Sequence, residues 1–576
     1  MVDKKGAGLP KETMEAMERD ALVNASRHDG KAEVGAVVGK MLGEFPDLRK
    51  QANEVAAQAG AVVKRVNSMS PVEQTKLLQS RYPEAVAAQP KAAETRQLPP
   101  LANAVKGKTA FRLPPEPSGF MTIGHAMAWT INYLYSEMYD GELWLRFEDT
   151  NPKKVAIKYY DNFREGTKWL GITVDHEKNL SDDNELIYDY GKKLLEKGEA
   201  YACSCDEAKV KKDRFDGKEC PHRKQSVDVN LRIWSEMLAR KHAEGTYVIR
   251  LKSDMSSLDY SLRDPNIFRI IDHEHPLTGS KYVVWPTYNL ANTIEDEICG
   301  ITHILRSAEF PVALQELLRK KLGFRKVEVI QFTRFNFKGT PVHKRLLRPL
   351  VEQGLVSGWD DPRMPTVDGV RRRGIIPETI RQFTLQVGYT KAEHEYDWSL
   401  LFAVNRKLLD PISKRIYFVP DPVKVSVEGA PRKRATIKFH PEFDMGSRTI
   451  ETAGEFFIPR SDLDAMPEGT TFRLMELYNA KLISKGGVVR AKYAGEEMIP
   501  DTRKVQWVTE DHAERKVLEP GELFDASGAF NKDSLVELRG YGERAIENLK
   551  EGEIVQMPRF GFCRVDSSST LILAHG

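Results

Sequence analysis

The sequence has few cysteines, no long apolar run and almost no net charge. Five cysteines in 576 residues are too few for a disulfide framework, which favours a reducing compartment, so we expect a cytoplasmic protein. No apolar run approaches the ~18 residues that a membrane-spanning helix needs, and the charged first residues lack the apolar stretch of a secretory signal. A membrane protein, a membrane partner and a disulfide-stapled secreted protein are therefore not expected.

The chain has little excess charge of either sign, because its 86 basic residues nearly balance its 83 acidic ones and give a net charge of +3. A nucleic-acid partner would therefore have to be bound through local basic clusters. Two basic triplets, at 371–373 and 432–434, are such clusters. The commoner meaning of a single triplet is a solvated basic surface, and a phosphate contact is the alternative.

Residues 1–100 differ in composition and in residue pattern from the rest of the chain. Segments rich in Ala and Val carry charges at helical spacing. Ser70 followed by Pro71 is typical of a helix start with Ser70 as the N-cap, so we expect a helix over 71–82. The tract 87–108 has the low complexity of a linker. We predict a helical appendage that docks a protein partner or a nucleic acid, and the sequence does not identify which.

Beyond about residue 106, short β-prone runs alternate with amphipathic helices, the pattern of an α/β domain. Strands are expected at 108–115 and 142–149, and helices at 122–139, about 155–170 and 184–201. From about 400 onward, apolar and polar residues alternate between glycine and proline breaks. Strands without long intervening helices predict β-barrels or sandwiches there.

The loop 114–126, PPEPSGFMTIGHA, joins the first of these strands to the first helix. The free amides and the dipole at a helix start favour an anion. Gly124 permits close approach of a ligand, and His125 can donate to a phosphate oxygen. An ordinary strand-to-helix turn with a surface histidine is the alternative.

Five blocks, in order, resemble the glutamyl/glutaminyl branch of the class I aminoacyl-tRNA synthetases. They are the loop 114–126, RFEDTNP at 146–152, YNLANTIEDEICGITHILRSAEF at 288–310, GTPVHKR at 339–345 and GWDDPRMPT at 358–366. The resemblance covers roughly residues 106–420. It implies a class I Rossmann-type catalytic domain that uses ATP and Mg²⁺ to activate an amino acid.

The resemblance also implies the nucleotide site. Thr122 stands where the family's HIGH-type motif begins with histidine, and His343 stands where its KMSKS-type loop usually has serine. Lys344, the cation that neutralises charge on the phosphates, is retained. Catalytic roles are implied for Thr122, His125 and Lys344. The implied ATP-binding residues are Pro115, Glu116, Pro117, Gly119, Thr122, Gly124, His125, Val342, His343, Lys344 and Arg345.

The same resemblance implies which residues select the amino acid. They are Arg112, Glu148, Tyr288 and Arg306. Glu148 takes the position of the residue that holds the α-ammonium. Arg306 takes a position that is arginine in glutamyl enzymes and typically small and uncharged in glutaminyl ones. A guanidinium pairs with the γ-carboxylate of glutamate and loses that partner with glutamine. The alternative is a structural ion pair of Arg306 with Glu309 or Asp296.

Three cysteines and a histidine, Cys203, Cys205, Cys220 and His222, are spaced as C-x-C and C-x-H. Such ligands suit a tetrahedral Zn²⁺, and the charged stretch between them has too little apolar content to fix itself. We expect a structural zinc, with buried or free thiols as the alternative. Cys299 and Cys563 are isolated and are expected to be small core residues.

The predicted fold is α/β, with an N-terminal helical appendage, a Rossmann-type catalytic domain interrupted by an acceptor-end-binding insertion, and C-terminal all-β barrels. The resemblance implies that these barrels bind the anticodon and are of the archaeal and eukaryotic kind. The boundaries are 1–100 for the appendage and linker, 101–184 and 283–345 for the Rossmann halves, 185–282 for the insertion, 346–405 for a helical subdomain and 406–576 for the barrels.

The predicted function is glutamate–tRNA ligation, with L-glutamate, ATP and tRNA-Glu as substrates. The alternatives are a glutaminyl-tRNA synthetase, a non-catalytic tRNA-binding paralogue and, less well supported, a free-standing nucleotidylyltransferase. The sequence does not say whether tRNA-Gln is also charged.

Overall fold

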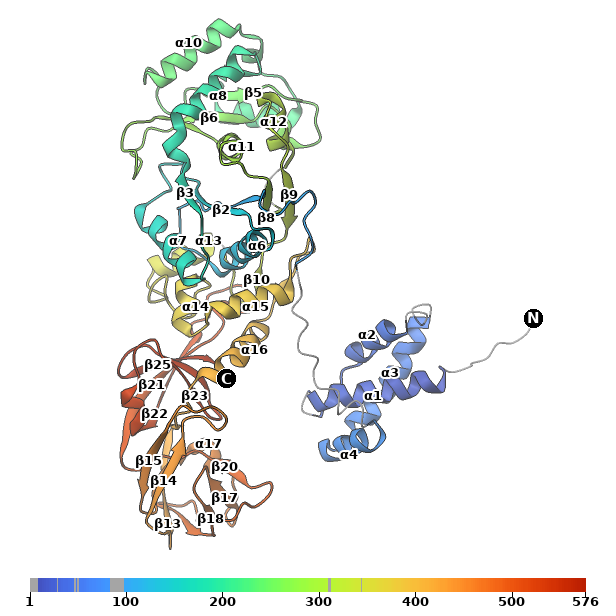
Figure 1. Ribbon diagram of the computed structural model, residues 1–576, viewed down its shortest axis with the longest axis vertical. Helices are drawn as coiled ribbons and strands as arrows, with labels where there is room; N and C mark the ends of the chain where they lie inside the picture. The colour runs from blue at the N-terminus through green and yellow to red at the C-terminus, as the bar shows by residue number, and fades with distance from the viewer. Residues whose placement is uncertain are drawn as a thin grey trace, which may run out of the picture. The chain divides into compact units, whose positions relative to one another are not determined.

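The chain forms two compact units, Met1–Arg96 and Gln97–Gly576. The computed structural model describes residues 9–27, 30–45, 48, 51–82, 98–308, 312–342 and 344–576. Figure 1 shows the helices of the smaller unit and the mixed helices and strands of the larger one. None of the helices in these ranges combines the length and the apolar content that crossing a membrane takes.

The smaller unit is helical, as predicted. Its helices are α1 (Lys11–Arg27), α2 (Val34–Glu44), α3 (Ala52–Asn67) and α4 (Pro71–Arg81). Helix α4 begins as the sequence indicates, because the Ser70 hydroxyl accepts from the Glu73 amide and the Glu73 carboxylate accepts from the Ser70 amide at 2.8 Å. This reciprocal cap satisfies two amides that the helix itself cannot.

The predicted linker over 87–108 lies outside the described residues as far as residue 97. From residue 98 the chain packs on the larger unit, where Leu98 and Leu101 are buried in the core. The tract is thus part of the larger unit from that point, although its composition is that of a linker.

Two small parallel sheets lie next to each other in the first part of the larger unit. The first contains β1 (Ala110–Leu113), β2 (Glu142–Phe147) and β3 (His176–Asn179), and the second β8 (His303–Ser307) and β9 (Glu328–Phe332). The Thr302 amide donates to the Ala110 carbonyl at 3.0 Å and joins the two groups. Helices α6 (Ile123–Tyr139), α7 (Ile157–Trp169), α11 (Tyr288–Ile298) and α12 (Val312–Leu322) connect or cover them.

An antiparallel four-stranded sheet interrupts these two groups. Its strands are β4 (Ala200–Cys203), β5 (Val248–Leu251), β6 (Asn266–Ile270) and β7 (Val284–Pro286), with α8 (Asn184–Glu196), α9 (Glu207–Asp216) and α10 (Val227–Leu238) around them (Figure 1). The helix expected over 184–201 is therefore too long by one turn. Gly198 takes φ of +66° just after α8, which ends the helix and lets β4 begin.

The next part of the chain is mainly helical. It contains α13 (Lys344–Glu352), α14 (Val367–Arg373), α15 (Pro377–Val387) and α16 (Trp398–Leu409), and a short parallel pair of β10 (Asn336–Phe337) and β11 (Glu395–Tyr396). Within this region Pro349 lies inside α13, where it removes a helix hydrogen bond. The stability of α13 therefore depends on packing.

Two six-stranded sheets dominate the C-terminal region, which confirms the prediction of a β-rich end of the chain; the first of their strands begins at Phe418, after α16 has ended at Leu409. One has the order β12-β22-β21-β25-β24-β23 and the other β16-β13-β19-β18-β17-β20. The strands are β12 (Phe418–Pro420), β13 (Pro422–Glu428), β16 (Glu455–Pro459), β17 (Thr471–Leu474), β18 (Asn479–Ser484), β19 (Val489–Tyr493), β20 (Arg503–Val505), β21 (His512–Pro520), β22 (Leu535–Glu543), β23 (Ile554–Met557), β24 (Gly561–Val565) and β25 (Thr570–His575). A hairpin of β14 (Lys433–Lys438) and β15 (Ser447–Thr452) accompanies them.

The basic triplet 371–373 ties the helices to the C-terminal sheet. Arg372 donates to the two carboxylate oxygens of Asp566 at 2.9 and 2.8 Å. Arg373 donates to the carbonyls of Ala574 and Pro520, each at 3.0 Å. Two of the three arginines thus bind protein, so a solvated surface does not describe Arg372 and Arg373, whereas Arg371 is exposed.

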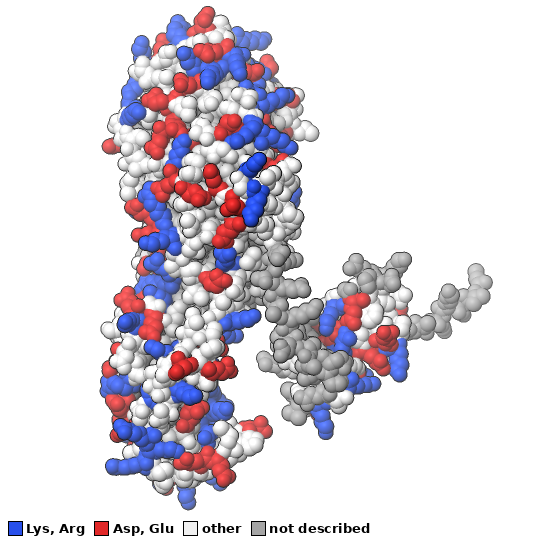
Figure 2. Space-filling model, in the orientation of Figure 1, with Lys and Arg blue, Asp and Glu red and all other residues white. Residues whose placement is uncertain are grey.

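The second triplet, 432–434, also has acidic neighbours. Lys433 pairs with Glu496 at 2.7 Å and Arg434 with Glu451 at 3.5 Å. On the face of the larger unit drawn in Figure 2, basic and acidic side chains of the described residues are interspersed. On that face, therefore, opposite charges balance locally as well as over the whole chain.

Candidate functional site

The loop 114–122 and the start of α6 form a compact turn after β1. The Thr122 amide and hydroxyl both contact Nδ1 of His125, at 3.1 and 2.9 Å. Because an amide can only donate, Nδ1 accepts and the neutral imidazole carries its proton on Nε2. The sequence signal for a helix start at Thr122 is confirmed, and Thr122 holds the His125 ring rather than pointing away from it.

His125 is held neutral by its surroundings. Burial, together with the positive charges of Lys344 and Arg334, lowers its pKa to about 3. Aromatic rings also surround it, with Phe163 edge-on at 5.5 Å between ring centroids. A neutral imidazole with one N–H can donate a hydrogen bond to an anion without adding a full charge.

Lys344 lies against the same loop, although it comes 226 residues after Ser118. Its Nζ donates to the Ser118 hydroxyl at 3.0 Å. A Cβ added at Gly119 would lie 2.8 Å from the Lys344 side chain, so any residue larger than glycine there would push the lysine away. Burial lowers the pKa of Lys344, while the nearby carboxylate of Glu116 acts in the opposite direction.

The other residues expected at the nucleotide site differ in exposure. Pro115 and Pro117 are buried, whereas Glu116 and Arg345 are exposed and Val342 is half-buried. A Cβ at Gly124 would make only ordinary contacts, 3.6 Å from the Phe335 carbonyl oxygen. His343 lies outside the described residues. The structure therefore brings the loop 114–125 and Lys344 together around one site.

A second group of side chains lies at the ends of β1, β2 and β8. Three arginines bind the buried carboxylate of Asp296: Arg112 through Nε at 2.8 Å, Arg146 at 2.8 Å and Arg319 at 2.6 Å. Burial opposes ionisation of Asp296, but the three positive charges outweigh it and lower its pKa to about 2. Three cations share one anion, so this group favours a further negative charge.

Arg306 and Tyr288 meet in this group. The guanidinium of Arg306 lies 3.5 Å from the Tyr288 hydroxyl, and only 6% of Arg306 is exposed. Burial lowers the pKa of Arg306 and raises that of Tyr288 to about 12. Two residues were the alternative ion-pair partners of Arg306. Glu309 lies outside the described residues, and Asp296 already binds three other arginines.

Glu148 connects the two groups of residues. Its backbone amide donates to the Pro115 carbonyl at 2.8 Å, which fixes the end of β2 to the loop 114–122. Burial raises the pKa of its carboxyl to about 7, against the lowering effect of Arg112 and Arg146. Among the described residues, its Oε1 has no hydrogen-bond partner. Asn292 also hydrogen-bonds this carboxyl, so Oε1 is the atom left for a cationic group of a ligand.

The sequence did not predict a role for Arg146, Asn292 or Arg319, and it offered Asp296 only as an alternative partner of Arg306. Asn292 accepts from Arg146 at 2.6 Å. Three of the α11 residues, Tyr288, Asn292 and Asp296, are four residues apart and so share one helix face. That four-residue spacing of polar residues is the signal that could have identified Asn292 and Asp296.

The predicted metal ligands come together in the inserted sheet. The sulfur atoms of Cys203 and Cys205 lie 3.7 and 3.6 Å from that of Cys220, and Nδ1 of His222 lies 3.4 Å from Cys220. All four ligand atoms lie within 4.8 Å of one another. Zn–S and Zn–N bonds of about 2.3 and 2.0 Å give tetrahedral edges of roughly 3.3 to 3.8 Å. The cluster therefore fits a Zn²⁺ ion.

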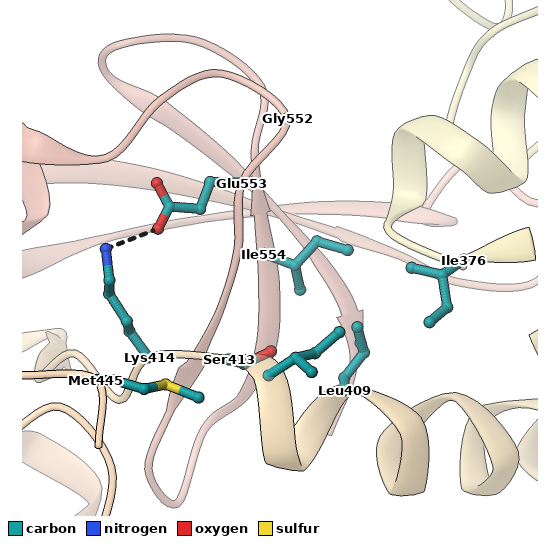
Figure 3. A pocket seen from close by; sticks show the side chains of 9 residues that line it. Ile376, Leu409, Ser413, Lys414, Met445, Gly552, Glu553 and Ile554 are labelled. Atoms are coloured by element: carbon teal, nitrogen blue, oxygen red, sulfur yellow. Dashed lines mark hydrogen bonds and ion pairs between the residues drawn. The ribbon is translucent and has the colours of Figure 1, made fainter. Parts of the chain in front are cut away.

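Cys299 and Cys563 are buried and lie apart from this cluster, as expected of core cysteines. A pocket of about 480 Å³ lies elsewhere, where α16 meets β23 (Figure 3). Its lining is mostly aliphatic, with an ion pair of 3.3 Å between Lys414 and Glu553. It contains none of the residues that the sequence motifs identify.

Family models match almost the whole larger unit. Residues 108–411 match the catalytic domain of "tRNA synthetases class I (E and Q)". Residues 413–494 and 504–566 match two anticodon-binding domains of the same group.

Full-length relatives agree. A glutamate–tRNA ligase of Nitrosopumilus maritimus is 38% identical over 570 residues, covering 98% of this chain and all of the relative. A glutamate–tRNA ligase of Pyrococcus furiosus is 38% identical over 561 residues, covering 95% and 96%. A crystal structure of glutamate–tRNA synthetase from Elizabethkingia anophelis covers 53% of this chain and 71% of its own at 19% identity, with a TM-score of 0.39, too low to support an argument.

Proposed function

The chain belongs to the class I tRNA synthetases of the glutamate and glutamine group, and from this premise we propose that it is a glutamate–tRNA ligase. It activates L-glutamate with ATP to glutamyl-adenylate, releasing pyrophosphate. It then transfers the glutamyl group to the 3′-terminal adenosine of tRNA-Glu.

The observation that carries this proposal is the excess of buried guanidinium groups around Arg306. Arg112, Arg146 and Arg319 share the single carboxylate of Asp296, and Arg306 lies beside Tyr288. A ligand with two carboxylates supplies the missing negative charge, and a neutral amide supplies less of it. Glu148, with its unpaired Oε1, suits the ammonium of the same ligand. These charges favour glutamate over glutamine.

The residues of the nucleotide site act by position and charge. Attack of the α-carboxylate on the α-phosphorus of ATP adds negative charge to the phosphates, which Lys344 and the His125 N–H stabilise. Thr122 fixes the tautomer and orientation of His125. Mg²⁺, which the family uses with ATP, supplies further positive charge on the phosphates. No protein nucleophile is needed.

Transfer to RNA is supported by the match of the C-terminal region to anticodon-binding domains. The 3′-terminal ribose hydroxyl attacks the adenylate carbonyl, and AMP leaves. The inserted sheet is the part expected to hold the acceptor end. A Zn²⁺ held by Cys203, Cys205, Cys220 and His222 would be structural, because the four ligands leave no open position for a substrate.

Two rivals remain to be tested. A glutaminyl-tRNA synthetase would share the fold but not the use of an arginine at 306. A non-catalytic paralogue would bind tRNA without consuming ATP, as the departures at Thr122 and His343 from the usual motifs allow.

ATP–pyrophosphate exchange in the presence of tRNA separates the catalytic proposal from the paralogue. We expect glutamate-dependent exchange with the wild-type protein and a loss of at least a hundredfold in Lys344→Ala, because the phosphate charge is then unopposed. Absence of exchange with either amino acid, in a protein that still binds tRNA, would favour the paralogue.

A further inference from the structure

Asp296 is the most heavily bonded carboxylate near the amino-acid site. It lies on α11 and its side chain has no exposed surface. Three arginines from three different elements bind it: Arg112 from β1, Arg146 from β2 and Arg319 from α12. Its Oδ1 accepts from both Arg112 and Arg146, and its Oδ2 accepts from Arg319. The carboxylate is thus fully occupied by protein and does not face a ligand.

The bond to Asp296 fixes which part of Arg112 remains for other contacts. Nε of Arg112 is used by Asp296, whereas its NH2 is buried and has no hydrogen-bond partner among the described residues. The positive charge of Arg112 acts on Glu148, Tyr288 and Arg306, which line the proposed amino-acid site. A buried donor without a partner is costly unless a ligand or a water molecule accepts from it. NH2 of Arg112 is therefore a buried donor that a bound ligand could satisfy.

Asp296 also sets how much positive charge the site retains. Its single charge is shared among three guanidinium groups, and Arg306 adds a fourth close by. The remaining excess attracts an anionic substrate, while the carboxylate keeps the arginines from repelling one another. The geometry and the charge of the site thus both depend on a residue that touches no substrate.

We propose that Asp296 is a positioning residue for amino-acid selection, acting through Arg112 and Arg146 to favour glutamate over glutamine. The proposal rests on the proposed function and extends it to a residue outside the substrate contacts. Oδ1 of Asp296 holds the two strand arginines at the ends of β1 and β2, and Arg319 binds the other carboxylate oxygen, Oδ2. Its removal leaves the arginines present but free to turn away.

The test is Asp296→Asn, assayed by ATP–pyrophosphate exchange with tRNA present. We expect the KM for glutamate to rise at least tenfold and the KM for ATP to stay within twofold, because Lys344 and His125 belong to a separate group of contacts. The preference for glutamate over glutamine should fall by a similar factor. Glu18→Gln is the matched control: it removes a carboxylate that is also buried and bound by two arginines, Arg65 at 2.6 Å and Arg81 at 2.9 Å, but lies in the smaller helical unit. We expect its KM for glutamate to stay within twofold of wild type.

A double variant, Asp296→Asn with Arg319→Gln, separates position from charge and guards against failure to fold. It removes one charge of each sign, so the net charge of the cluster is unchanged. If position is decisive, the KM for glutamate stays high, whereas recovery to the wild-type value overturns the proposal. Asp296→Glu, which retains the carboxylate, should recover part of the loss.

Two further results would overturn the proposal: a folded Asp296→Asn protein with the wild-type KM for glutamate, or equal rises in the KM for glutamate and for ATP, which would indicate general distortion. Folding is followed by thermal unfolding. A wild-type protein that activates no glutamate would instead refute the proposed function itself, so the two failures are distinguishable.

Discussion

At the scale of residues, the proposed choice of glutamate over glutamine depends on a single guanidinium beside a tyrosine hydroxyl. Arg306 is 6% exposed, and a buried arginine gains more from a carboxylate than from an amide. We therefore expect Arg306→Ala to raise the KM for glutamate more than tenfold. Exchange kinetics in the presence of tRNA measure it.

The matched control for this substitution is Arg460→Ala. Arg460 is an exposed arginine in the C-terminal region that pairs with Asp421 at 2.9 Å, and an exposed pair contributes little. Its replacement should leave the KM for glutamate within twofold. An unchanged KM in Arg306→Ala would remove the selective role from that residue.

The carboxyl of Glu148 gives the site a dependence on pH. Burial raises its pKa to about 7 from an ordinary 4.5, so the folded protein holds the proton more tightly than the unfolded chain does. Stability from this group is present below about pH 4.5 and is lost as the pH rises through 7. Binding of the substrate ammonium has the opposite sign, because it needs the ionised carboxylate.

We accordingly expect the KM for glutamate to fall as the pH rises from 6 to 8, measured at saturating ATP. Glu148→Gln should have a higher and nearly flat KM over the same range. The carboxyl of Glu295 also has its pKa raised to about 7 by burial, so Glu295→Gln serves as the comparison and should keep the dependence. A flat profile in the wild type would contradict the account.

At the scale of single elements, helix α9 depends on a metal-ligand cluster rather than on a core, although the sheet beside it has a core of its own. Helix α9 buries only Val210 among its described residues, too little apolar surface to fix a ten-residue helix. Burial raises the pKa of the Cys205 thiol to about 12, so thiolate formation there needs a positive ion.

Removal of zinc should therefore loosen this element. We expect about one Zn²⁺ per chain by elemental analysis, and a lower Tm after chelation or in Cys220→Ser. Cys563→Ser, in a cysteine that is equally buried but far from the cluster, should leave the zinc content unchanged. A protein that purifies without metal and unfolds at the same temperature with chelator would contradict a structural zinc.

How far the sequence predicts these elements depends on whether the signal is local. Helix α6 was predictable because its cap, Thr122, and the partner of that cap, His125, are three residues apart. The ligands of the metal cluster were predictable for the same reason, since they occur as two short pairs. The end of α8 was predicted too late in the chain, because the amphipathic pattern continues past Gly198 although this residue takes a positive φ.

The sequence could not predict that several arginines gather around Asp296, and the reason is physical. Arg112 and Asp296 are 184 residues apart, and a pair so distant leaves no periodic trace in the chain. Resemblance to a family identified Arg112 and Arg306 but not Arg146 or Arg319, which share the carboxylate of Asp296 with Arg112. Likewise, the triplet 371–373 could not be assigned without the position of Asp566.

At the scale of the whole larger unit, the C-terminal sheets and the nucleotide site are in contact. The loop between β21 and β22 carries Leu523, which is fully buried with Leu347 and Leu350 of α13. The amide of Phe524 in the same loop donates to the Gly339 carbonyl at 3.1 Å. Because α13 begins at Lys344 and contains a proline, this loop supports the helix that carries the lysine.

Leu523→Ala should therefore affect catalysis as well as stability. A buried Leu→Ala change costs about 2–5 kcal/mol, and the loosened α13 should lower the kcat of exchange severalfold with little change in the KM for glutamate. Val536→Ala, at a position on β22 that is 46% exposed, is the control and should match wild type. A folded Leu523→Ala protein with full kcat would show that the loop does not support Lys344.

The central claim, that a guanidinium-rich site couples an acidic amino acid to RNA, is tested most directly by a charging competition. Purified protein, ATP, Mg²⁺ and tRNA-Glu transcript are incubated with equal concentrations of labelled glutamate and glutamine, and the aminoacyl-tRNA is identified. The account predicts glutamyl-tRNA in at least hundredfold excess. Glutaminyl-tRNA as the main product, or no charged tRNA from a protein that binds the transcript, would contradict it.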